Sequence, residues 1–108
     1  MNVFINEREL VNEENQATTK LKYYRTETEL AGITYFGVGI EQYKQNVDNF
    51  SLESYSEERG VTYSLETITG IIELLSNNTV MPEHLVEILD DLGDTIAREA
   101  QNKTFATA

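Results

Sequence analysis

The single histidine of the chain is the side chain best suited to chemistry at neutral pH. His84 lies in the first turn of an expected helix, beside Glu83 and near Glu87. A two-residue metal site could form there, but a catalytic zinc usually takes three protein ligands, and the chain has no cysteine and no second histidine. We interpret His84 as a surface histidine and expect neither a metal nor a cofactor.

Paired carboxylates are the second candidates for acid–base chemistry. They occur at residues 13–14, 57–58 and 90–91. General acid–base catalysis needs two carboxylates in contrasting environments, one of them removed from water. These pairs fall in expected turns and on an expected helix surface, and no Gly-x-Ser-x-Gly nucleophile motif is present. We therefore do not expect an enzyme.

Acidic residues recur along one face of the expected second helix. Glu83, Glu87 and Asp91 are spaced by four, with Asp90 and Asp94 beside them. Like charges at this spacing cost stability. A face kept at that cost is a candidate surface for a basic protein partner, and we name these five residues as partner-binding candidates. The alternative is a merely solvated helix face.

Tyrosine supplies a second candidate surface, because the chain contains six of them and tyrosine is favoured at protein interfaces. Tyr43 and Tyr55, together with Tyr63, could line a partner or dimer surface. Ordinary packing in antiparallel strands is the alternative interpretation.

The charge balance bears on the class of partner. The net charge is −11, from 19 acidic and 8 basic residues, and this excess repels phosphate backbones. We expect no direct binding of duplex DNA. Lys20, Lys22 and Tyr24 share one side of an expected strand and could stack single-stranded RNA, which stays a minor alternative.

Alternating apolar and polar residues in the first half of the chain predict an antiparallel meander. The expected strands are residues 3–11, 18–30, 33–45 and 50–56, joined by turn-forming residues at 12–15, 31–32 and 46–49. In the third strand Val38 and Ile40, with Phe36, are expected to face the core. Gly37 and Gly39 then lie on the other side, where we expect a crossing helix to need the close approach that glycine allows.

From Ser64 the apolar period changes from two residues to 3.6, which predicts helices. Ser64 suits the N-cap of the first helix, residues 77–78 its end, and Pro82 the first turn of the second helix. The expected apolar stripes are Leu65, Ile68, Ile71, Ile72 and Leu75 in the first helix and Leu85, Ile88, Leu89, Leu92 and Ile96 in the second.

The predicted fold class is therefore α+β, a four-stranded antiparallel meander followed by two α-helices packed on one face. Residues 1–100 are expected to form one domain and residues 101–108 a frayed tail. The opposite sheet face is left uncovered, and a homodimer could cover it. The lack of cysteine, of a leader-like start and of a long apolar run predicts a cytoplasmic protein without a membrane association.

Two segments resemble a family of uncharacterised small proteins from Firmicutes and their mobile elements. They are residues 35–41 (YFGVGIE) and residues 71–85, where Pro82-Glu83-His84-Leu85 opens the second helix. The resemblance spans roughly residues 20–95 and implies a fold, because its motifs are structural.

The small size and acidic charge also resemble anti-CRISPR proteins of mobile elements that inhibit Cas9. This resemblance implies a binding inhibitor of Cas9 or of its guide RNA complex, acting on guide loading or in the basic nucleic-acid channel. It transfers no individual residue. A regulatory or adaptor protein of a mobile element with another protein partner is the alternative function.

Overall fold

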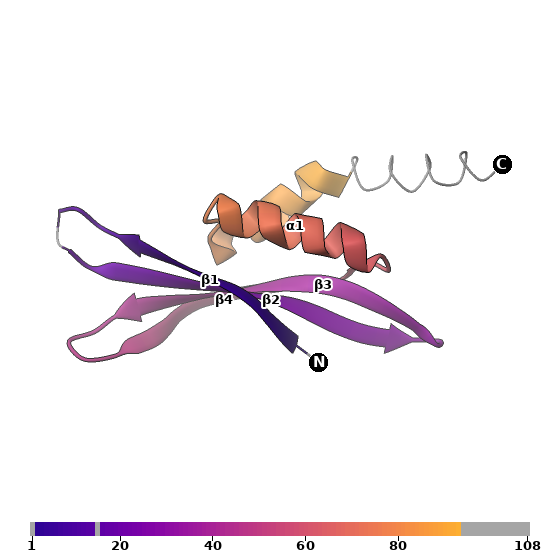
Figure 1. Cartoon of the computed structure of the whole chain (residues 1–108), viewed down its shortest axis with the longest axis horizontal. Helices are drawn as coiled ribbons and strands as arrows, with labels where there is room; N and C mark the ends of the chain where they lie inside the picture. Colours follow the sequence, from indigo (N-terminus) through magenta and orange to yellow (C-terminus); the bar gives the residue numbers. More distant parts are fainter. Residues whose placement is uncertain (1, 15, 94–108) are drawn as a thin grey trace.

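The computed structural model describes residues 2–14 and 16–93. Four strands precede the helices (Figure 1), in the order predicted from the sequence. The strands are β1 (Asn2–Val11), β2 (Thr18–Leu30), β3 (Ile33–Gln45) and β4 (Phe50–Thr62). The helices are α1 (Leu65–Asn77) and a 3₁₀ turn, η1 (Pro82–His84), which continues as α-helix through residues 85–93. The predicted α+β class is thereby confirmed.

The sheet is a simple meander in which each strand pairs antiparallel with the next, in the order β1-β2-β3-β4. The β2–β3 hairpin turns at Ala31 and Gly32, whose φ angles are 53° and 80°. Two successive residues with positive φ are the signature of the two-residue turn that matches strand twist. The expected turn at these residues is confirmed.

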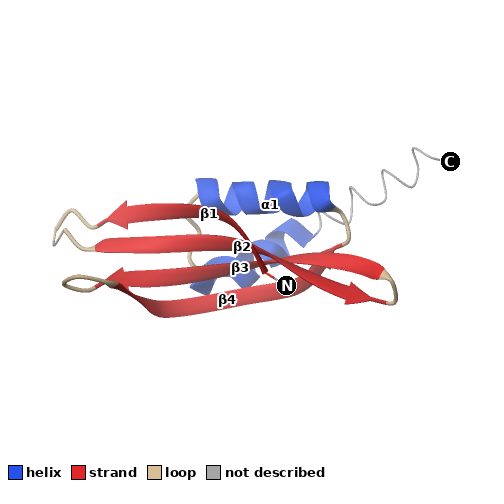
Figure 2. Ribbon diagram, turned by 60° about the horizontal axis from the view of Figure 1, so that its bottom comes forward, coloured by secondary structure: helices blue, strands red, loops and turns tan. Residues whose placement is uncertain are grey.

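Both helices lie on one side of the sheet (Figures 1 and 2), and the core lies between the two layers. Each layer contributes side chains that are 1% exposed or less. They are Leu21, Tyr23, Val38 and Ile40 from the sheet and Ile68, Ile72, Leu75 and Leu85 from the helices. The predicted core face of β3 is correct.

Polar contacts fix the position of the helical layer over the sheet. The buried hydroxyl of Tyr23 on β2 donates to the carbonyl of Val80 at 2.9 Å, and burial raises the pKa of Tyr23 to about 12. From β1, Asn6 Nδ2 donates to Ser76 Oγ at 3.1 Å. Arg8 Nε donates to the Ser76 carbonyl at 3.3 Å, at the C-terminal end of α1 where a cation is favoured.

The predicted helix ends agree with the structure. The Ser64 side chain accepts from the Thr67 N–H at 3.2 Å, and Asn78 follows the last residue of α1. The prediction that Leu65 belongs to the buried apolar stripe is wrong, because this residue is 50% exposed. It is the first residue of α1, where the chain has only just left the sheet. In the second helix Ile88, Leu89 and Leu92 pack against the core.

The fourth strand is longer than predicted, since it continues from residue 56 to Thr62. Its pairing with β3 shifts twice, between Gln42 and Tyr43 and between Phe36 and Val38. Extra residues at these shifts disturb the strict alternation of side chains. The alternation of apolar and polar residues is therefore lost from the sequence after residue 56, although the strand continues to Thr62.

The glycines of β3 need a different explanation from the predicted one. The helices cover the face of Val38 and Ile40, so the expectation that a helix crosses the glycine face is wrong. A Cβ on Gly37 would collide with the Glu58 carbonyl oxygen and lie 2.8 Å from Arg59 Cα. The close neighbour is thus the backbone of β4 at its register shift.

Residue 94 and those after it lie outside the described residues. They include the end of the predicted domain at residue 100, the predicted tail at 101–108, and Ile96 and Asp94. No helix among the residues that the structure describes is long and apolar enough to cross a membrane.

We expect Gly37→Ala to destabilise the fold by about 1–3 kcal/mol, because the added methyl group meets backbone that cannot rotate away. Gly39→Ala is the matched control. Its methyl group would meet the Tyr55 hydroxyl oxygen at 3.5 Å, an ordinary contact. Urea unfolding monitored by circular dichroism measures both. Equal effects of the two substitutions would show that the β4 backbone does not restrict Gly37.

Candidate functional site

The predicted acidic residues that the structure describes are all exposed on the helical layer. Glu83 is exposed on η1, and Glu87, Asp90 and Asp91 are exposed on the helix at residues 85–93. His84 lies between two carboxylates, with Nε2 3.7 Å from Glu83 Oε1 and Nδ1 3.9 Å from Glu87 Oε2. Within residues 2–14 and 16–93, no three His, Cys, Asp or Glu side chains are placed to hold a metal ion.

Charge is segregated between the two layers of the fold. Residues 60–93 contain six acidic residues, all exposed, and no lysine or arginine. We call this set the acidic helical layer; it consists of Glu66, Glu73, Glu83, Glu87, Asp90 and Asp91. This segment contains no fixed cation of its own, and the one at its edge is Arg8 of β1, which donates to Ser76 and Asn77 at the end of α1. Glu66 and Glu73 on α1 were not predicted from the sequence as part of an acidic surface. Their spacing along the expected helix was a signal that could have identified them.

The basic residues of the described chain belong to the sheet, where several contact carboxylates. Lys20 Nζ is 3.9 Å from Glu9 Oε1, and Arg25 Nη2 is 3.0 Å from Glu27 Oε1. Arg59 Nε is 3.0 Å from an oxygen of Glu57. The sheet therefore has a mixed charge pattern, in contrast to the acidic helical layer.

The sheet face opposite the helices, which we call the open face, carries both predicted tyrosines. Tyr43 pairs with Lys20 and Tyr55 pairs with Glu41, on the side away from the core residue Ile40. The predicted partner-binding residues are thus divided between two opposite surfaces. Tyr43 and Tyr55 cannot join the acidic residues of the second helix in one contact patch.

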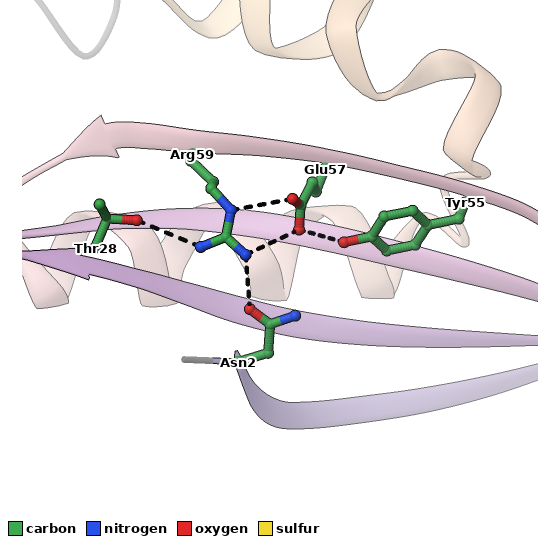
Figure 3. A network of polar contacts seen from close by, with 5 residues as sticks. All are labelled: Asn2, Thr28, Tyr55, Glu57 and Arg59. Carbon is green, nitrogen blue, oxygen red and sulfur yellow. Dashed lines mark hydrogen bonds and ion pairs between the residues drawn. The ribbon is translucent and has the colours of Figure 1, made fainter.

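Arg59 organises one end of the open face, as Figure 3 shows. Its guanidinium donates to Glu57 at 3.0 Å, and its two terminal nitrogens each reach a further strand at 3.4 Å, to Thr28 Oγ1 and Asn2 Oδ1. The side chain crosses β3 near Gly37, which has no side chain to obstruct it. The sequence analysis did not predict a role for Arg59 and placed Glu57 in a turn. The signal available in the sequence was Gly37, a glycine inside a strand.

Tyrosine–glutamate hydrogen bonds occupy the middle of the open face. The Tyr43 hydroxyl donates to Glu41 at 3.0 Å, and the Tyr55 hydroxyl donates to Glu57. Burial and the bond to Glu57 raise the pKa of Tyr55 to about 12, while the same bond and Arg59 lower the pKa of Glu57. Each shift moves the group further from neutrality. The pair therefore suits structural pairing better than proton transfer at neutral pH.

Two aromatic contacts at the other end of the open face involve lysines. Lys20 Nζ lies 4.1 Å from the centre of the Phe50 ring, and Lys22 Nζ lies 5.0 Å from that of Tyr43. Cations held over aromatic rings in this way gain a modest stabilisation. The lysines proposed as an alternative RNA-binding set are therefore engaged with the sheet itself.

The lowered pKa of Glu57 predicts a stabilisation that depends on pH. Its ionised form is favoured by folding, so the contribution is present above the unfolded value of 4.5 and is lost as the pH falls through the lower folded value. We expect Glu57→Gln to lower the melting temperature at pH 7 more than at pH 3. Glu29→Gln, an exposed change on β2, is the control. An equal loss at both pH values would contradict the prediction.

Comparison with known proteins identifies a family. A family model described as "Family of unknown function (DUF6514)" matches residues 1–95. No curated protein and no solved structure matches the chain. Because the family model covers both the sheet and the described helices, the protein belongs to the DUF6514 family.

Proposed function

We propose that this protein acts by binding a basic surface of another protein through its acidic helical layer. The observation that carries the proposal is the segregation of charge, with six exposed carboxylates and no lysine or arginine in residues 60–93. Such a surface attracts a basic one, accelerates encounter and repels acidic competitors.

The construction of the helical layer supports this role. Its apolar side packs on the sheet through residues such as Ile68, Ile72 and Leu85, so the acidic side chains are held on a packed support. Tyr23 fixes the segment between the helices through the Val80 carbonyl. A charged surface on a rigid layer loses less conformational entropy when it binds than one on a loop.

In its specific form, the proposal is that the partner is a Cas9 protein, bound inside the host cell before its guide RNA. Cas9 holds its nucleic acid in positively charged channels, which are exposed when the guide is absent. The support is the net charge of −11, the acidic helical layer and the resemblance of this small acidic chain to anti-CRISPR proteins. The alternative partner is another basic protein, with this chain as a regulatory or adaptor protein.

A DNA-cleavage assay with two orders of addition tests the specific form. We expect loss of cleavage when the protein is added to Cas9 before the guide RNA, and full cleavage when it is added afterwards, because the guide then fills the channel. Loss in both orders would place the inhibition at a later step. Full cleavage in both orders, across several type II-A Cas9 proteins, would overturn the Cas9 proposal in favour of the adaptor alternative.

Charge reversal tests the surface. We expect Glu87→Lys combined with Asp91→Lys to weaken binding to guide-free Cas9 about tenfold or more, which corresponds to about 1.4 kcal/mol. Each reversal removes one negative charge and adds one positive charge, so the double variant has a net charge of −7 instead of −11. Binding of the wild-type protein should also weaken steeply with salt. Isothermal titration calorimetry at two salt concentrations measures both effects.

The matched control reverses Glu13 and Glu14 to lysine. These residues lie in the exposed turn between β1 and β2, and the double variant has the same net charge. We expect it to bind much more tightly than the helix variant. Equal weakening by the two variants would show that total charge matters and that the acidic helical layer is not the binding surface.

A further inference from the structure

The open face exposes apolar side chains to solvent although it belongs to a well-formed sheet. Phe4 and Val11 on β1, and Leu52 and Tyr55 on β4, are all exposed there. No element among residues 2–14 and 16–93 covers this face (Figure 2). We propose that a second copy of this chain covers it, in a face-to-face homodimer whose twofold axis runs along the strands between β2 and β3.

The size of the face fits such a dimer. Three of its four strands have 13 residues. At the usual spacing of about 4.8 Å between strands and rise of about 3.3 Å per residue, the sheet covers about 19 × 43 Å, or about 800 Å². A specific interface of standard size buries about 800 Å² on each partner. The open face therefore provides the area that a stable dimer needs.

Several polar groups of the face are already paired within one chain, which lowers the cost of removing them from water. Tyr43 donates to Glu41, and Tyr55 donates to Glu57. Arg59 contacts Glu57, Asn2 and Thr28. A second copy would therefore cover satisfied hydrogen bonds together with exposed apolar side chains.

The pair of opposite charges at Lys22 and Glu41 favours a second copy as the occupant and indicates the symmetry. Lys22 on β2 lies directly opposite Glu41 on β3 in the sheet register. An axis along the strands lays β2 of one copy over β3 of the other at the same level, so each Lys22 meets Glu41 of the partner copy. The contact occurs twice, as a twofold interface requires. An axis across the strands would instead lay β2 over β2 and β3 over β3, so Lys22 on β2 would not meet Glu41 on β3 of the partner copy.

The proposed dimer leaves the acidic helical layers on its two outer sides. It is therefore independent of the proposed function, although it would make binding bivalent. Either proposal can fail while the other holds, because one concerns the helices and the other the opposite face of the sheet.

Sedimentation equilibrium of the full chain tests whether a second copy covers the open face. We expect a mass of twice the 12.3 kDa of one chain, and at least a tenfold weaker dimer for Leu52→Asp. Leu74→Asp is the matched control, since Leu74 is 45% exposed on α1 and Leu52 is 54% exposed on the open face. Circular dichroism confirms that both variants fold. A wild-type monomer at all concentrations, or equal weakening by both variants, would overturn the proposal.

A mixing experiment tests the symmetry. Lys22→Glu and Glu41→Lys should each be monomeric alone, because each places like charges across the twofold axis. A mixture of the two variants should form heterodimers, since the introduced glutamate of one chain then meets the introduced lysine of the other, and the native pair forms in the second contact. Native mass spectrometry resolves these species. Recovery of the dimer on mixing cannot arise from a contact within one chain, because residues 22 and 41 of each variant carry like charges. A mixture that stays monomeric would overturn the proposed twofold arrangement.

Discussion

The packing of short helices on one face of a long sheet is the constraint on which the other features depend. A strand of 13 residues spans about 43 Å, whereas α1, also of 13 residues, spans about 20 Å. The helices can therefore bury the central part of one face, at Leu21, Tyr23, Val38 and Ile40. The opposite face and the hairpin at residues 30–33 stay outside this core (Figure 1).

This layered arrangement separates two kinds of surface. The helical layer has its apolar side in the core. Within residues 65–93 its ionisable side chains are carboxylates and His84, and all of them are exposed. The sheet retains the cations of the described chain, and several of them contact neighbouring glutamates or aromatic rings. An acidic surface and a mixed, aromatic surface thus lie back to back. The proposed basic partner and the proposed second copy would therefore occupy different surfaces.

The open face also shows how one backbone position can determine a side-chain network. The register shift in β4 brings its backbone against β3, and only glycine fits at residue 37. The absence of a side chain there leaves room for Arg59 to reach Thr28 and Asn2 on the strands beyond β3. The same register shift therefore explains two features. It requires glycine at residue 37, and it allows the polar network around Arg59.

The sequence by itself determined the order of elements, the core face of β3, the caps of α1 and the acidic helix, because these follow from local periodicity and from side chains that bond within a few residues. Tertiary structure alone decided the rest. The length of β4 and the role of Gly37 depend on register shifts between strands, which leave no periodic signal. The separation of Tyr43 and Tyr55 from Glu83 and Glu87 depends on which sheet face the helices cover. That choice is made by packing between residues far apart in the chain.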